Sequence, residues 1–284
     1  MFSSSKLESK MRVNFINIKL WYLITPLFLL LFILFYFIFI SKGDNFNDAY
    51  INLQKDLFFY LNSVLSKYSS LQFNLTQLGD VLISFSLLSV FIFYTPKLWE
   101  ALLTSAILSL IVSSTLKEIF SVPRPATIFN HDSFTIIGRV CSGYASLPSG
   151  HSIATFVVIT VLLFAFMPKK KMNKIFLSFF MLLIGLVVAF SRVGVGAHFP
   201  LDVIIGSTIG YIIAIIGILI NNKIKWLSWI ENKKYYPIFI VLLTICAWVI
   251  ITKIINTNLL IFYFSLVTLM ITLYLLINSY VKKN

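Results

Sequence analysis

Charged residues are scarce in this chain. They make up 12% of its 284 residues, whereas hydrophobic residues make up 59% and the mean hydropathy is +0.93. A soluble domain of this length could not bury so much apolar surface. The composition therefore excludes a soluble globular protein and predicts a chain that crosses a membrane several times.

Cysteines are also few, and their positions argue against a disulfide framework. Cys141 stands in a polar loop, Cys246 stands inside an apolar run, and the chain has no other cysteine. A scaffold held by disulfides needs several cysteines at regular spacings. We therefore expect no disulfide between these two residues.

Long apolar runs account for the high hydropathy. We place spans at residues 20–40, 81–95, 99–116, 152–168, 175–191, 200–221, 236–252 and 258–280. The runs at 81–95 and 99–116 are short for a hydrocarbon layer of about 30 Å. The sequence thus predicts an all-α fold, a polytopic transmembrane helix bundle. Residues 1–221 would hold a core of six spans, and residues 222–284 would hold two additional transmembrane helices.

The net charge of +13 is explained by the membrane topology, so we expect no nucleic-acid partner. With the N-terminus in the cytoplasm, 15 of the 23 basic residues fall on the inner side. The other eight fall on the outer side: Lys42, Lys55, Lys67, Lys117, Arg124, Arg139, Arg192 and Lys253. The positive-inside rule selects this orientation. The first span lacks a small-residue cleavage site and precedes Lys42-Gly43-Asp44, so we expect it to be a retained helix.

Residues 46–79 form the longest segment outside the spans before the polar motifs. Apolar residues recur there at helical spacing: Tyr50, Leu53, Leu57, Phe58, Leu61, Val64, Leu65 and Tyr68. The other side carries Asn47, Asp48, Lys55, Asp56, Asn62 and Ser66. The pattern predicts an outer amphipathic helix that lies on the membrane face or caps the bundle. Simple packing and a role in substrate entry would both account for it.

Three polar clusters interrupt the apolar sequence. The first is Lys117 followed after six residues by Arg124-Pro125, the second is Pro148-Ser149-Gly150-His151, and the third is Ser191-Arg192 followed after five residues by His198 and after three more by Asp202. The predicted topology places all three at the outer ends of spans. They bring together three cations, two histidines and one carboxylate. A metal-free phosphoryl-transfer site at a membrane surface needs these groups.

The cations of these clusters suit a phosphate ester. Lys117, Arg124 and Arg192 can neutralise its non-bridging oxygens, and the arginines can bind them bidentately. A single interfacial cation is more often a snorkelling or headgroup-anchoring residue. Pro123 and Pro125 stiffen the backbone on both sides of Arg124, however, and a simple anchor does not need that.

The second cluster opens an apolar run and is typical of an anion site at a helix N-terminus. Ser149 fits an N-cap position, and Gly150 allows the backbone to approach a ligand closely. The free N–H groups and the dipole of the helix favour a negative charge. His151 then stands at the mouth of the site, although a lone interfacial histidine is usually structural.

The third cluster pairs an imidazole with a carboxylate. His198 and Asp202 are four residues apart, one turn on the same helical face, and Pro200 between them favours a helix start. An aspartate near the bilayer edge is costly without a partner. The pairing would satisfy Asp202, fix the tautomer of His198 and leave the other ring nitrogen free to attack.

A metal site is the chemical rival of this arrangement. Its possible ligands are His131, Asp132, His151, His198 and Asp202. Divalent hydrolytic centres usually gather several carboxylates, and the whole chain has ten acidic residues. The three cations beside the histidines would also repel a metal ion. We therefore expect neither a metal nor another cofactor.

Taken together, the clusters resemble the three-part signature of the type 2 phosphatidic acid phosphatase superfamily, which includes bacterial acid phosphatases and vanadium haloperoxidases. Every spacing of that signature is met within 86 positions. The resemblance implies that His198 is the nucleophile and becomes a phosphohistidine, that Asp202 orients it, and that His151 is the acid for the leaving group. It also implies a set of residues that hold the phosphate oxygens: Lys117, Arg124, Ser149, Gly150 and Arg192, supported by Ser191.

The resemblance further implies a metal-independent integral membrane enzyme that acts on lipid phosphate or diphosphate esters, such as undecaprenyl diphosphate, lipid A or phosphatidate. Bacterial members of this kind face the periplasm from the inner membrane. The two extra C-terminal spans depart from the usual six-helix plan. One alternative is a lipid-phosphate-binding transporter or flippase without hydrolytic activity. It would keep the cations but would not need the spacing of His198 and Asp202.

Overall fold

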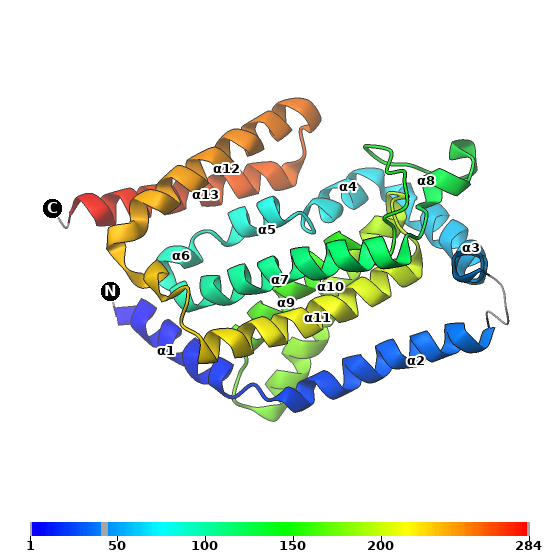
Figure 1. The fold of residues 1–284 in the computed structure, drawn as a ribbon. Coiled ribbons are helices and arrows are strands. Elements are labelled where there is room, and N and C mark those ends of the chain that lie inside the picture. The colour runs from blue at the N-terminus through cyan, green and yellow to red at the C-terminus, as the bar shows by residue number, and fades with distance from the viewer. Residues whose placement is uncertain (1, 41–44, 283–284) are drawn as a thin grey trace.

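The computed structural model describes residues 2–40 and 45–282, and these residues form helices and loops without a strand. Lys42 lies outside the described residues. The long helices run roughly side by side in an elongated bundle (Figure 1). Among the described residues, six helices are long and apolar enough to cross a membrane, which confirms the prediction of an all-α polytopic bundle. They are α2 (Ile24–Ile40), α7 (Pro96–Phe120), α10 (Lys171–Gly194), α11 (Pro200–Lys223), α12 (Tyr236–Thr257) and α13 (Leu260–Val281).

A shorter apolar helix, α9 (Gly150–Ala165), lies at the centre of the bundle and packs on α7, α10 and α11. Its contact with α11 brings the two backbones close together, because α11 presents glycines to it. A Cβ atom at Gly206 would lie 2.7 Å from the carbonyl oxygen of Ser149, and one at Gly210 would overlap the carbonyl oxygen of Ile153. Side chains at these two positions would push the helices apart. Glycine therefore sets the distance between α9 and α11.

The predicted span at 81–95 is not one helix. It is divided into α5 (Val81–Leu88) and α6 (Phe91–Tyr94), and Ser89 lies at the break. The Ser89 hydroxyl is fully buried and lies 2.8 Å from the hydroxyl of Thr272 on α13. The break is thus stabilised by a polar group of α13, more than 170 residues further along the chain. The hydropathy of residues 81–95 could not have predicted this contact.

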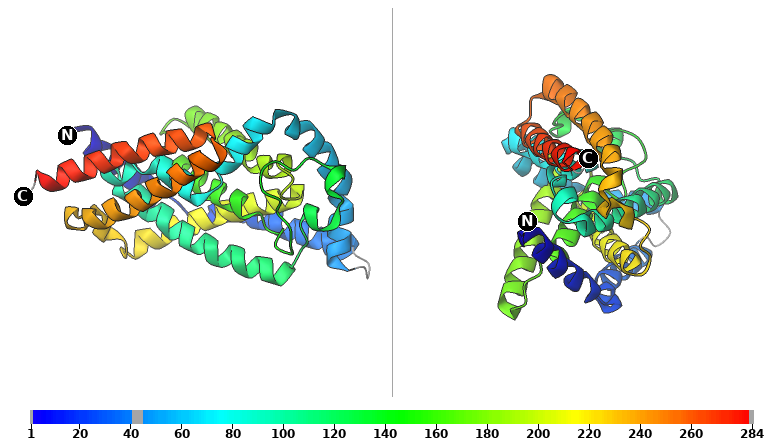
Figure 2. Two further views of the ribbon diagram at one scale, coloured as in Figure 1. Left: turned by 90° about the horizontal axis from the view of Figure 1, so that it is seen from above. Right: turned by 90° about the vertical axis from the view of Figure 1, so that its left-hand side faces the viewer.

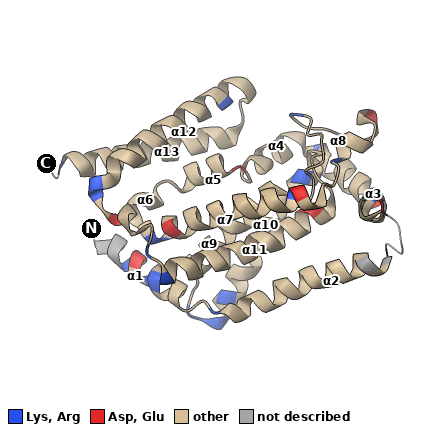
Figure 3. Cartoon of the chain, viewed as in Figure 1, with Lys and Arg blue, Asp and Glu red and all other residues tan. Residues whose placement is uncertain are grey.

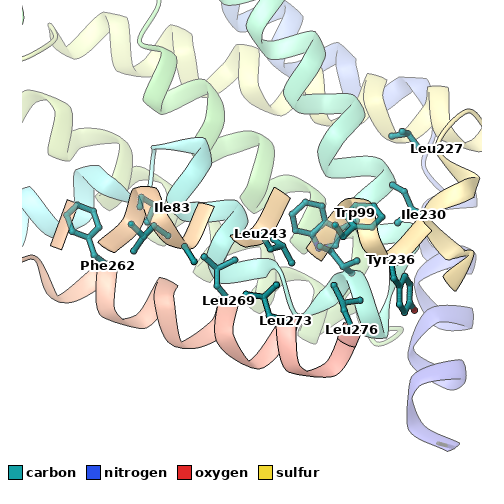
Figure 4. Close-up of a cluster of buried hydrophobic side chains, with 14 of the residues drawn as sticks. Ile83, Trp99, Leu227, Ile230, Tyr236, Leu243, Phe262, Leu269, Leu273 and Leu276 are labelled. Atoms are coloured by element: carbon teal, nitrogen blue, oxygen red, sulfur yellow. The ribbon is translucent and has the colours of Figure 1, made fainter. Parts of the chain in front are cut away.

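The two C-terminal helices cover this broken segment. α12 and α13 pair with each other, and α13 packs along α5. The contact is a cluster of buried side chains that includes Ile83, Leu243, Leu269 and Leu273 (Figure 4). At its outer end Lys253 of α12 pairs with Asp80, at 2.9 Å between Nζ and Oδ2, and Asp80 is also the N-cap of α5.

The first helix, α1 (Phe2–Ile16), was not predicted. Met11 and Phe15 on α1 are buried against α7, α9 and α11. Arg12 forms ion pairs with Glu8 and Glu231 at the same end of the bundle. Charged residues gather towards the two ends of the long helices (Figure 3), as expected for a bundle whose middle lies in hydrocarbon.

The remaining helices are short or lie at the end of the bundle opposite to α1. They are α3 (Phe46–Leu65), α4 (Ser69–Gln77) and α8 (Pro125–Ile128), with the 3₁₀ helices η1 (Leu20–Leu23), η2 (Ser66–Tyr68), η3 (His131–Ser133), η4 (Ser228–Glu231) and η5 (Lys233–Tyr235). α3 and α8 lie at the right-hand end of Figure 1, together with the loops that hold the polar clusters.

The close approach of α9 and α11 can be tested by substitution. We expect Gly210→Ala to lower the thermal unfolding temperature in detergent, because overpacking a well-packed core costs about 1–3 kcal/mol. Gly185→Ala on α10 is the matched control. There the added Cβ would meet only side-chain atoms of Phe156 and Ile159, at 3.1–3.2 Å, and these can shift. Equal melting of the two variants would contradict the packing role of Gly210.

Candidate active site

The three polar clusters meet at one end of the bundle, where the loop between α7 and α9 folds over the ends of α9, α10 and α11. Backbone hydrogen bonds connect them. The Ser149 N–H donates to the carbonyl oxygen of Asp202 at 3.1 Å, which joins the second cluster to the third. The Arg124 N–H donates to the carbonyl oxygen of Gly143 at 2.9 Å, which fixes the first cluster on the loop that leads to the second. The site is therefore held by main-chain contacts.

The second cluster forms a capped helix N-terminus, as predicted. α9 begins at Gly150, and the Ser149 Oγ accepts hydrogen bonds from the N–H of Ser152 at 3.4 Å and from its hydroxyl at 2.9 Å. A Cβ atom at Gly150 would lie 3.3 Å from the Lys117 Nζ. The ammonium group of the first cluster therefore reaches the N-terminus of α9, where a larger residue would crowd it.

His198 and Asp202 are neighbours, but not in the way their spacing suggested. α11 begins at Pro200, so His198 lies outside the helix in the preceding bend. The prediction of one shared helical face was wrong, because Pro200 has no N–H and starts the helix between the two residues. Asp202 instead reaches back. Its Oδ2 accepts from the N–H of Phe199 at 2.9 Å and lies 3.4 Å from the His198 Nδ1.

Two further donors bind the Asp202 carboxylate, and the sequence had not pointed to either. The Tyr50 hydroxyl on α3 donates to Oδ1 at 2.7 Å, and the Ser146 hydroxyl donates to Oδ2 at 2.6 Å. Asp202 is fully buried, so these bonds replace water around its charge. Ser146 lies two residues before the second cluster and could have been considered. Tyr50 is 152 positions away and had no sequence signal for this role.

Arg124 faces the other nitrogen of the His198 ring. Its Nη1 lies 3.5 Å from the His198 Nε2 and donates to the carbonyl oxygen of Ala197 at 3.3 Å, while its Nη2 donates to the carbonyl oxygen of Ala145 at 3.2 Å. A guanidinium group can only donate, so Nε2 must be the acceptor of that contact. The proton of a neutral His198 then resides on Nδ1, next to Asp202.

Arg192 is buried beside this pair and is held from α4. Its Nη1 donates to the Thr76 hydroxyl at 2.8 Å, and its exposure is 8%. Its Nε is buried and has no hydrogen-bond partner among the residues that the structure describes. A buried guanidinium with an unused donor suits an anionic ligand.

The two other predicted residues differ in their placement. His151 lies in the first turn of α9, close enough to His198 and to the cations of Arg192, Lys117 and Arg124 for their charges to act on its ring. Ser191 does not join the group through its side chain. Its hydroxyl donates to the carbonyl oxygen of Val188 at 2.6 Å, within its own helix.

The segment 46–79 contacts the site with polar side chains. Asn62, which the helical pattern placed opposite the apolar residues, is buried and donates to the carbonyl oxygens of Thr135 and Val193, each at 3.0 Å. The apolar Leu57 and Tyr68 are 51% and 67% exposed, as expected for a helix that lies on the membrane face. The surface under α3 consists of loops whose backbone groups need partners, so polar residues turn inwards.

Burial and charge set the protonation of the two residues that flank Asp202. Burial lowers the pKa of His198 well below 6.5, and the positive charges of Arg124, Arg192 and Lys117 lower it further. Burial raises the pKa of Tyr50 well above 10.0, and the charge of Asp202 adds to this effect. At neutral pH, His198 is therefore a neutral base and Tyr50 keeps the proton that it donates.

Of the possible metal ligands, His198 and Asp202 are neighbours. Across residues 2–40 and 45–282, no group of three or more His, Cys, Asp or Glu side chains is placed to hold a metal ion. His131 lies in η3, and its Nε2 is 3.0 Å from the carbonyl oxygen of Ala126.

The domain that contains these clusters has known relatives. Residues 97–226 match the family model described as the PAP2 superfamily. This superfamily is the one whose signature the clusters resemble, and the matched residues include all three of them. The match thus falls on the part of the chain that holds the three clusters, within a bundle of apolar helices.

One solved structure is also similar to the chain. LpxE from Aquifex aeolicus shares 25% sequence identity with it, with a TM-score of 0.48, over 59% of this chain and 95% of that chain. No curated protein sequence matches the chain at a significant level.

The contact between Tyr50 and Asp202 can be tested by removing one oxygen atom. We expect Tyr50→Phe to lower kcat about tenfold to a hundredfold with little change in KM, because a hydrogen bond to a charged group contributes about 1.5–3 kcal/mol. Phosphate release at saturating lipid phosphate measures this. Tyr60→Phe is the control, since Tyr60 lies on the same helix and is 65% exposed. An unchanged kcat in Tyr50→Phe would exclude the positioning role.

Proposed function

We propose that the protein hydrolyses lipid phosphate or diphosphate esters without a metal ion, through a phosphohistidine at His198. One observation carries the proposal. The His198 Nδ1 faces a fully buried carboxylate, while its Nε2 faces the guanidinium of Arg124. A histidine in this setting has its tautomer fixed by the acid and its free lone pair directed towards a cation, which is where a phosphoryl group would bind.

The first chemical step would transfer the phosphoryl group. The Nε2 lone pair attacks the terminal phosphorus, and the bond from this phosphorus to the leaving oxygen breaks, which is the lipid oxygen of a monoester or the bridging oxygen of a diphosphate. His151 gives its proton to the leaving oxygen. The imidazole gains positive charge in this step, and Asp202 stabilises it through Nδ1. In the second step a water molecule gives a proton to His151 and attacks phosphorus. Inorganic phosphate leaves, and the Nε2 lone pair is restored.

The cations would stabilise the charge that develops on the equatorial oxygens. Lys117 reaches the N-terminus of α9, and Arg192 has a buried donor without a partner in the part of the chain that the structure describes. Arg124 would exchange one of its carbonyl partners for a phosphate oxygen. Preorganised donors of this kind are worth most in a site that excludes water, and His198 is 1% exposed. Ser149 and Gly150 would add the backbone N–H groups of the helix end.

The substrate would be a lipid because the site lies at the end of a bundle of membrane-spanning helices. We favour the undecaprenyl diphosphate, lipid A or phosphatidate type. The distribution of basic residues supports a bacterial inner-membrane protein whose site faces the periplasm. In this proposal residues 1–221 hold the catalytic unit. Residues 222–284 support this unit through the packing of α13 on α5 and through the ion pair of Lys253 with Asp80. Asp80 follows Gly79, which lies directly against His151: an added Cβ at Gly79 would be 2.8 Å from the Cβ of His151.

The nucleophile is tested by substitution in the presence of EDTA. We expect the unchanged protein to release phosphate from lipid phosphates with EDTA present, and we expect His198→Ala to abolish this release. After a rapid acid-free quench, phosphate should be found on His198 of the unchanged protein. His131→Ala is the control, because His131 lies in η3 and its Nε2 contacts the backbone carbonyl of Ala126 in α8. Full activity of His198→Ala would end the mechanism, and activity that needs added magnesium would end its metal independence.

The orientation of the protein in the membrane is tested with the thiol of Cys141, in the loop before α9. Cys141 is half-buried and lies beside the guanidinium of Arg192. We expect an impermeant thiol reagent to modify it in intact spheroplasts and to inhibit the enzyme by filling the entrance of the site. Cys141→Ser should keep its activity after the same treatment. Modification that requires opened cells would place the site in the cytoplasm instead.

A further inference from the structure

A cavity of about 590 Å³ lies at the end of the bundle opposite the candidate active site. The end of α1, the C-terminal half of α9 and the N-terminal half of α10 line it, and it is partly open. Its inner wall is apolar and includes Phe164, Leu163 and Met181, whereas its rim carries Lys169 and Lys174. None of the groups assigned to phosphoryl transfer lines this cavity.

The cavity exists because α10 leaves the bundle at this end. Its C-terminal half packs on α3, α4, α9 and α11, but its N-terminal half extends away from the other helices (Figure 2, right, light green). Large apolar side chains on this half are exposed, among them Met172 at 75% and Phe176 at 71%. A second cavity of about 510 Å³ continues the first between α2, α10 and α11, and both are lined by Phe156, Leu182 and Tyr211.

The rim of the first cavity is strongly basic. Lys169, Lys170, Lys171 and Lys174 follow one another at the turn from α9 to α10, and all four are exposed. No carboxylate of the described residues lies within 4.0 Å of any of them. Two of the four, Lys169 and Lys174, line the cavity, and the other two do not. An elongated apolar space with an unpaired basic rim matches a molecule with an anionic head and hydrocarbon chains.

We propose that this cavity binds an anionic phospholipid of the bilayer, with its phosphate at Lys169 and Lys174 and its acyl chains between α9 and α10. The polar rim also offers Asn17, and Ser178 lies on the α10 side of the cavity. With the basic end of the bundle in the cytoplasm, the lipid belongs to the inner leaflet, where anionic headgroups attract juxtamembrane lysines. The site is separate from the catalytic end, so it stands whether or not His198 is the nucleophile.

The two pairs of lysines provide a matched test. Purified protein in a neutral detergent is titrated with phosphatidylglycerol, and with phosphatidylcholine of the same chains, and bound lipid is counted by native mass spectrometry. We expect Lys169→Gln with Lys174→Gln to weaken phosphatidylglycerol binding about 30-fold, since each lysine near the headgroup contributes about 1 kcal/mol. Lys170→Gln with Lys171→Gln removes the same charge from the same turn and should bind nearly as the unchanged protein.

A third variant tests the apolar part of the site. Ser178→Phe leaves all four lysines in place and fills part of the cavity, and we expect it to weaken binding as well. Thermal unfolding without added lipid shows whether each variant is folded. Equal weakening by both lysine pairs would reduce the effect to diffuse surface charge and overturn the proposal. Binding of phosphatidylcholine as tight as phosphatidylglycerol, or unchanged binding in Ser178→Phe, would overturn it too.

Discussion

The architecture of the candidate active site depends on one buried carboxylate. Asp202 is fully buried, and its charge is held by donors from three separate segments: Tyr50 of α3, Ser146 of the loop before α9, and the backbone and ring at the start of α11. A buried carboxylate that lost these donors would be destabilised by several kcal/mol. The position of each segment is therefore tied to that of the others, and His198 takes its place from the same set of bonds.

The packing of the central helices makes this arrangement possible. Gly206 and Gly210 allow α11 to approach the backbone of α9, and Gly206 lies one turn after Asp202. The Ser149 N–H can then reach the Asp202 carbonyl, so the capped N-terminus of α9 and the residue that carries the carboxylate on α11 lie side by side. The rigid contact between α9 and α11 within the membrane thus fixes the distance between Ser149 and Asp202 at the water interface. Loops alone would position these residues less accurately.

Features that depend on nearby residues could be predicted from the sequence. The membrane-spanning helices follow from the length of apolar runs, the cap at Ser149 from its hydroxyl at the start of such a run, and the start of α11 from the missing N–H of Pro200. The partners of the site could not be predicted in this way. Tyr50, Asn62 and Thr76 belong to α3 and α4, and each meets a residue more than 70 positions away.

The same distinction explains the errors. The break at Ser89 depends on Thr272 of a helix far along the chain, and the inward face of α3 depends on loops whose path no periodicity reveals. Ser191 satisfies the family spacing, but its hydroxyl bonds to its own helix, because rotamer choice is not visible in a motif. The prediction of a shared helical face for His198 and Asp202 was wrong because the helix begins only at Pro200, after His198.

The position of α3 has a mechanical consequence. One face of this helix bonds Asp202 through Tyr50, and the other exposes Leu53, Leu57 and Tyr60, which suits the boundary between hydrocarbon and headgroups. The depth of α3 then follows the thickness and lateral pressure of the outer leaflet, whereas the depth of α11 follows the length of its own span. A change of bilayer thickness would move the Tyr50 hydroxyl relative to Asp202, so membrane composition would act on the reactivity of the imidazole without any ligand.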